Sequence, residues 1–152
     1  MNTIKAQYIS AVESLSDEAL RETLSTCDAQ ALDCVNWSEF PYAPSVNFRM
    51  ACSDKAIAVM FEVEENHIRA AAMENNGPVW EDSCVEFFFA PADDGIYYNI
   101  ECNPVGKLYF CYGEGRHGRQ MISQESLASI RRSCSLGEQA FGLKEGPAEW
   151  EA

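Results

Sequence analysis

Hydrophobic and polar residues alternate along much of the chain, in short runs that end at turn residues. Such alternation predicts β-strands with one buried face and one solvent-facing side. In residues 46–52, Val, Phe, Met and Cys alternate with Asn and Arg, whereas residues 56–63 are apolar on both faces and indicate a central strand. Further, shorter strands are predicted at 4–10, 68–73, 82–90, 96–103, 107–112 and 138–143.

Helix signals are few and short. Ser16 is a good N-cap, acidic residues follow it, and Leu15 and Leu20 occupy the staple positions, so a helix is predicted over 17–26. A second short helix is predicted over 124–133. We expect the Pro- and aromatic-rich connection 36–44 to pack down on the protein.

These elements predict an all-β fold, an antiparallel, jelly-roll-like β-sandwich with one or two short helices. The chain is expected to form one domain over residues 1–152. Because residues 149–152 look like the start of another strand, we expect the chain to be a fragment, incomplete at its C-terminal end.

Composition narrows the class of partner. The formal net charge is −13, which argues against nucleic acid and anionic membrane surfaces but is compatible with a neutral ligand or calcium. No apolar run has the roughly 18 residues of a spanning helix, and no signal peptide is recognisable. Seven cysteines without C-x-x-C spacing suggest reduced thiols in a cytoplasmic protein. The sequence leaves the oligomeric state undetermined.

The stretch 80–103 carries the most unusual chemistry. Its two strands, joined by an acidic turn, place Glu86 opposite Glu101 if the turn closes an antiparallel hairpin. Like charges across a ladder are tolerated if they are solvated, paired with Arg, or separated by a ligand or metal. A nearby Trp80 among acids and amides suits sugar recognition, in which the indole packs on C–H groups. Alternatively, Trp80 caps the sandwich and the acids form a solvated face.

Four segments carry a resemblance to a known family. The chain resembles family 9 carbohydrate-binding modules and related sugar-binding domains of gut bacteria over roughly residues 30–120. The segments that carry this resemblance are PVWEDSCVEFFFAP and YYNIECNPVGKLY, with the earlier VNWSEFPYAPSVNFRMA and AIAVMFEVEENHIRA. The resemblance implies a noncatalytic β-sandwich that binds mono- or oligosaccharides, takes part in carbohydrate catabolism beside xylanases or other glycoside hydrolases, and often carries calcium.

The resemblance also assigns ligand-binding residues. Trp80 would stack on the sugar, Glu86 would accept hydrogen bonds from hydroxyl groups, and contacts from the neighbouring strand would fall near Asn99 and Glu101. Family modules supply a second stacking Trp from their C-terminal part. No such Trp is matched here, because Trp150 falls too early and looks like the lead-in to a later strand.

Other functions stay open. A glycoside hydrolase could use Glu86 and Glu101, since retaining enzymes hold two carboxylates about 5–5.5 Å apart. An exposed sheet face without enclosing loops argues against it, because little burial would be available to raise a pKa. Asp93 and Asp94 could bind structural calcium in the acidic turn, and the chain could also be a structural or partner-binding sandwich without a sugar ligand.

The glycine-rich loop and the two histidines are weaker functional signals than the stretch 80–103. The glycine-rich loop 113–119 lacks the G-K-[ST] ending of a phosphate loop, and its arginines could instead reach a sugar acid. Neither His67 nor His117 is tied by spacing to a cysteine, which argues against a Cys–His nucleophile or a zinc site.

Overall fold

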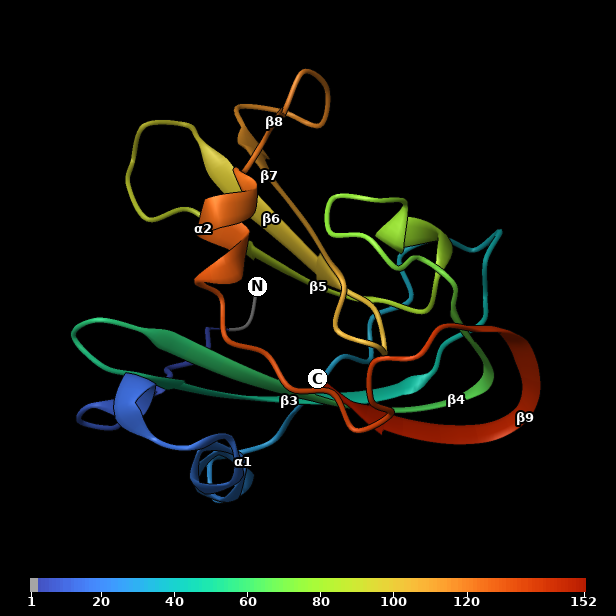
Figure 1. Ribbon diagram of the computed structural model, residues 1–152, viewed down its shortest axis with the longest axis horizontal. Coiled ribbons are helices and arrows are strands. Elements are labelled where there is room, and N and C mark those ends of the chain that lie inside the picture. Colours follow the sequence, from blue (N-terminus) through green and yellow to red (C-terminus); the bar gives the residue numbers. More distant parts are fainter. Residues whose placement is uncertain (1–2) are drawn as a thin grey trace. The chain divides into compact units, whose positions relative to one another are not determined.

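The computed structural model describes residues 3–152 and consists mainly of β-strands (Figure 1). The strands form two sheets, one in the order β1-β3-β4-β9 with β2 paired to β3, the other in the order β5-β6-β7-β8. The strands are β1 (Gln7–Tyr8), β2 (Gln30–Ala31), β3 (Ser45–Cys52), β4 (Ile57–Ala70), β5 (Val85–Phe89), β6 (Tyr97–Cys102), β7 (Leu108–Gly113), β8 (Gln120–Met121) and β9 (Phe141–Glu151).

The pairing is mostly antiparallel. Strands β2 and β4 run antiparallel to β3, whereas β1 runs parallel to it. In the other sheet, β5, β6, β7 and β8 each pair antiparallel with the next strand in the chain. The helices are short: the α-helices α1 (Asp17–Ser25) and α2 (Gln124–Ala128) and the 3₁₀ turns η1 (Val12–Ser14) and η2 (Val79–Glu81). The predicted fold class, an all-β sandwich with few short helices, is confirmed. In the described part of the chain, no helix has the length and apolar character that crossing a membrane requires.

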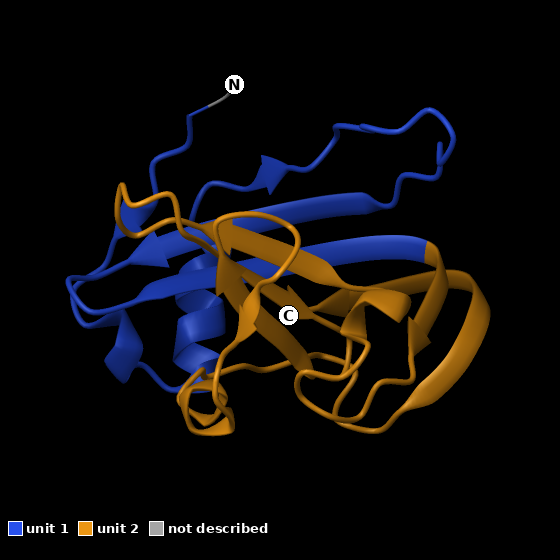
Figure 2. Ribbon diagram, turned by 90° about the horizontal axis from the view of Figure 1, so that it is seen from above, with its two compact units in different colours: residues 1–65 blue, residues 66–152 orange. Residues whose placement is uncertain are grey.

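The chain divides into two compact units, residues 1–65 and 66–152, which Figure 2 shows in different colours. In the first unit, β3 and β4 form a hairpin from Cys52 opposite Ile57 to Ser45 opposite Glu64. The hydroxyl of Ser53 accepts hydrogen bonds from the amides of Lys55 and Ala56, each at 3.2 Å, and this closes the turn between β3 and β4.

Helix α1 begins where the sequence predicts, because the Ser16 hydroxyl accepts a hydrogen bond from the Ala19 amide at 3.2 Å. Its last turn is covered by Arg49 on β3. The guanidinium donates to the carbonyls of Ser25 and Cys27 at 3.1 and 2.6 Å and pairs with the carboxylate of Glu62 at 2.9 Å. The core of this unit consists of Val12, Leu24, Cys27, Ala51 and Met60.

Three local predictions are wrong. Residues 68–73 do not form a separate strand, because β4 continues unbroken from residue 57 to 70. The connection 36–44 does not pack down, since Trp37 is 66% exposed and Phe40 and Tyr42 are exposed as well. The C-terminal residues 149–152 do not start a strand but lie at the end of the 11-residue β9, drawn red in Figure 1.

In the second unit the predicted hairpin is present, with β5 and β6 joined by an exposed turn and β7 paired to the other side of β6. Helix α2 begins at Ser123, whose hydroxyl accepts from the Ser126 amide at 3.1 Å. Its Leu127 is completely buried and packs with Leu108 and Phe110 on one face of this sheet. The hairpin therefore packs, on this face of the sheet, against an apolar core.

Candidate functional site

The register of the β5-β6-β7 sheet brings the polar residues of the hairpin onto one face. Glu86 lies directly opposite Glu101, as the sequence predicts, and Glu101 lies opposite Tyr109 on β7. Two residues further along β5, on the same face, Phe88 lies opposite Asn99. Because opposed residues share a face, these five side chains line the same side of the sheet.

The other side of this sheet fixes that register. Val85, Phe87 and Phe89 on β5 lie opposite Cys102, Ile100 and Tyr98 on β6. The Phe89 and Tyr98 rings stack with their centroids 5.1 Å apart, and they pack on the core formed around Leu127. A slip of one residue would turn these aromatic residues away from that core and the acids toward it, so the core dictates which face of the sheet the acids take.

Two polar side chains of the candidate site are buried and incompletely hydrogen-bonded. Asn99 is 1% exposed and Glu101 is 5% exposed. The Asn99 Nδ2 group donates to Glu101 Oε1 at 2.9 Å. Asn99 Oδ1 and Glu101 Oε2 have no hydrogen-bond partner among residues 3–152. Since buried acceptors are almost always satisfied in folded proteins, these two oxygens mark a place where a ligand could donate hydrogen bonds.

The two glutamates share an unfavourable electrostatic environment. Burial raises the pKa of Glu86, and the neighbouring charge of Glu101 raises it further, while Arg119 and Arg116 act in the opposite direction. Burial also raises the pKa of Glu101, against the hydrogen bond from Asn99 and the charge of Arg119. The argument that an exposed sheet face offers too little burial to raise a carboxyl pKa is therefore wrong for Glu101, which is buried, whereas Glu86 is exposed.

Trp80 lies on η2, which precedes β5 in the chain by three residues, and 54% of its surface is exposed. Its indole packs edge-on against the Tyr109 ring, with 5.1 Å between the centroids and an interplanar angle of 79°. Tyr109 is the residue opposite Glu101, so the indole stands next to the face that carries the two glutamates. Trp80 is thus half exposed beside the residue that faces Glu101, and its role as a stacking surface stays a prediction.

The segment that carries Trp80 is held by Asp82, whose role the sequence-based prediction missed. The Asp82 side chain is 1% exposed and accepts hydrogen bonds from the amides of Ala71 and Ala72 and from Asn103 Nδ2, at 2.9, 2.9 and 3.0 Å. Burial acts to raise the pKa of Asp82, but these hydrogen bonds and Arg69 outweigh it and lower the pKa. Asp82 is thus a structural anchor and not an open ligand contact.

Asn103 completes this anchor. Its Nδ2 group also donates to the Ala72 carbonyl at 3.0 Å, and its Oδ1 accepts from the amides of Val105 and Lys107 at 3.3 and 2.8 Å. Both ends of the side chain are therefore occupied. The polar residues of the stretch 80–103 therefore include a hydrogen-bonded pair, Asp82 and Asn103, and a second group, Glu86, Asn99 and Glu101, with acceptor oxygens that lack a partner among residues 3–152 or face solvent. The signal that could have separated them is position, because the satisfied pair lies outside the strand ladder.

Trp150 cannot supply a second stacking surface from its position, because it is 2% exposed near the end of β9. In the acidic turn, Asp94 Oδ1 accepts from the Ile96 amide at 2.9 Å, which is the hydrogen bond of an ordinary Asx turn. Asp93 and Asp94 are exposed and supply two carboxylates where calcium takes six to eight oxygens. Calcium binding by this turn stays a prediction.

Comparisons with known proteins identify the family of the chain. The family model described as "Carbohydrate-binding family 9" matches residues 16–152. A crystal structure from Bacteroides uniformis ATCC 8492, described as that of a putative carbohydrate-binding protein, superimposes with a TM-score of 0.88 and 38% sequence identity, covering 96% of this chain and 68% of that one. The comparison with curated proteins found no match. The chain belongs to carbohydrate-binding family 9.

Proposed function

We propose that this protein binds a mono- or oligosaccharide on the face formed by Trp80, Glu86, Asn99 and Glu101, without catalysing its hydrolysis. The observation that carries the proposal is the pair of buried, unpartnered acceptors, Asn99 Oδ1 and Glu101 Oε2, beside an exposed indole. Sugar hydroxyls donate to such oxygens while the C–H face of the ring packs on the indole.

Each residue has a distinct part in this proposal. Trp80 provides the apolar platform, steadied by Tyr109 behind it. Glu86 is exposed and accepts hydroxyl hydrogen bonds at the outer part of the face, whereas Glu101 and Asn99 accept at its inner part. The family membership supports carbohydrate as the ligand class, and we place the protein in carbohydrate catabolism, beside glycoside hydrolases.

The test begins with a glycan array and continues with calorimetric titration of the sugars that bind. We expect Trp80→Ala to weaken binding at least about tenfold, equivalent to about 1.4 kcal/mol. The matched control is Trp37→Ala, because Trp37 is also exposed but lies in the 36–44 connection. Equal affinity of the Trp80→Ala variant and the unaltered protein would refute the proposed site. An array without any bound glycan would favour a structural or partner-binding role instead.

Glycoside hydrolysis is the second candidate function. Glu86 and Glu101 each place a carboxylate oxygen within 4.8 Å of the other, and a raised pKa suits the general acid of such a pair, whereas the nucleophile must stay ionised. The assay is release of the aryl group from aryl glycosides by the purified protein. Turnover that Glu86→Gln abolishes would establish the hydrolase; sugar binding without turnover would exclude it for those substrates.

A further inference from the structure

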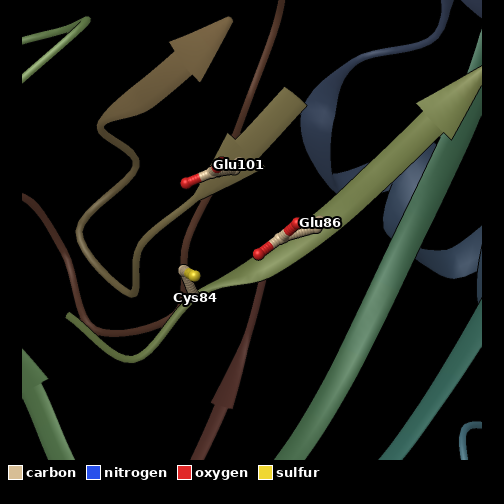
Figure 3. Close-up of side chains that lie close together, drawn as sticks. All are labelled: Cys84, Glu86 and Glu101. Carbon is tan, nitrogen blue, oxygen red and sulfur yellow. The ribbon is translucent and has the colours of Figure 1, made fainter. Parts of the chain in front are cut away.

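A cysteine stands next to the two opposed glutamates. Cys84 lies just before β5, two residues from Glu86, and Figure 3 shows its side chain close to those of Glu86 and Glu101. The three ligand atoms, one sulfur and one oxygen from each carboxylate, all lie within 4.8 Å of one another. Within residues 3–152 this is the group of three His, Cys, Asp or Glu side chains that meets this spacing.

An independent feature of the same place indicates a missing positive partner. Glu101 is 95% removed from solvent, and its Oε2 has no hydrogen-bond donor among the described residues. Arg116 and Arg119 act electrostatically on Glu86, but within the described chain neither forms an ion pair with either glutamate within 4.0 Å. The acidic pair is therefore only partly compensated by the protein itself.

We propose that Cys84, Glu86 and Glu101 bind a divalent cation of borderline softness, with Zn²⁺ as the expected ion. A thiolate ligand disfavours the hard ions Ca²⁺ and Mg²⁺, which take oxygen ligands, and favours zinc. Binding exchanges the Cys84 thiol proton for the Zn–S bond, and the proton leaves to solvent. Three protein ligands leave a fourth tetrahedral position for water or for an oxygen of another molecule.

The distances allow this with a small movement. Tetrahedral zinc with bonds of about 2.0–2.3 Å separates its ligand atoms by about 3.3–3.8 Å, so separations of up to 4.8 Å need to contract by no more than about 1.5 Å. Glu86 is exposed and can rotate inward, whereas Glu101 is fixed by the hydrogen bond from Asn99. The cation would sit between two carboxylates that otherwise face each other as like charges.

The inference uses two residues of the proposed sugar site but does not depend on sugar binding. The test is calorimetric titration of the 152-residue chain with Zn²⁺, under a reductant that does not bind metal. We expect one ion per chain, with affinity lowered at least about 100-fold in Cys84→Ser. Co²⁺ in place of zinc should give a thiolate-to-cobalt charge-transfer absorption that Cys84→Ser abolishes and Glu86→Gln weakens. Far-ultraviolet circular dichroism of each variant establishes that it folds.

Two matched controls separate this site from other thiols. Cys34→Ser removes an exposed cysteine of the first unit and should leave the titration unchanged. Cys134→Ser removes a thiol whose sulfur, like that of Cys102, approaches the Asn103 carbonyl, at 3.9 and 3.5 Å respectively. Loss of zinc binding in Cys134→Ser but not in Cys84→Ser would overturn the inference, as would absence of zinc binding in the unaltered chain.

The sugar titration is repeated in the presence of a chelator. Sugar binding that persists there, together with absent zinc binding, would remove the metal site and leave the proposed function standing. Zinc binding without any sugar binding would support the metal site and refute the proposed function.

Discussion

Replacing Asp82 by Ala tests how the Trp80 segment is held. The substitution removes an acceptor shared by the amides of Ala71 and Ala72 and by Asn103 Nδ2. Ala71 is exposed, so water can replace the carboxylate at its amide, but Ala72 and Asn103 are buried. Each buried donor left unsatisfied costs about 1–3 kcal/mol.

The expected loss in the free energy of unfolding follows from the number of buried donors left without an acceptor. Two buried donors give about 2–6 kcal/mol, and because Asn103 Nδ2 keeps the Ala72 carbonyl as an acceptor, we expect about 3 kcal/mol. The ion pair with Arg69, at 3.7 Å and with 40% of the arginine side chain exposed, adds at most about 0.5 kcal/mol. Asp82→Asn keeps one acceptor oxygen and should recover part of the loss.

The assay is urea denaturation near neutral pH, followed by circular dichroism, with Asp93→Ala as the control. Asp93 is exposed in the turn, so its substitution should change the free energy of unfolding by less than about 0.5 kcal/mol. The folded-state pKa of Asp82 is lowered, so its contribution is present above the unfolded pKa and is lost as pH falls through the folded value. A loss below about 1 kcal/mol in Asp82→Ala, or one that does not shrink toward acid pH, would refute this reasoning.

Three further predictions use the same measurements. The folded pKa of Glu101 is raised, so its contribution to stability is present below the unfolded pKa and is lost as pH rises through the folded pKa. Glu101→Gln should therefore gain stability relative to the unaltered chain as pH rises above the unfolded pKa, and an unchanged difference would contradict this. Leu127→Ala should cost about 2–5 kcal/mol in urea denaturation, because this side chain is fully buried in the core beneath the hairpin. Trp80→Ala should leave the free energy of unfolding within about 1 kcal/mol while sugar affinity falls, since half of the indole is exposed; a larger loss of stability would make Trp80 a structural cap.

The opposition of Glu86 and Glu101 could be predicted from the sequence because it needs only local information. Strand alternation and a closing turn set the register, and the aromatic residues on the alternate positions exclude a slip. The start of α1 was predictable for a similar reason, since the cap, Ser16, lies three residues from the amide it binds.

The partners of Asp82 and the exposure of Trp37 could not be predicted in this way. Asp82 accepts from residues 10 and 11 positions earlier and 21 positions later, so its role depends on how β4, η2 and the end of β6 come together. The aromatic and proline content of 36–44 suggests packing, but no apolar surface covers Trp37 or Phe40. Local composition does not report whether a partner surface is present.

The sequence by itself determined the longer strands of the two hairpins, the β5–β6 register, the helix starts and the family likeness, because these depend on alternation, turns and caps between near neighbours. The tertiary structure alone decided which polar residues are satisfied. In the folded chain Asn103 donates a hydrogen bond to Asp82, whereas Asn99 Oδ1 and Glu101 Oε2 are buried without a hydrogen-bond partner among residues 3–152. The tertiary structure also brought Cys84 beside the two glutamates. The physical reason is that burial and hydrogen-bond satisfaction depend on segments distant in the chain, which no local pattern encodes.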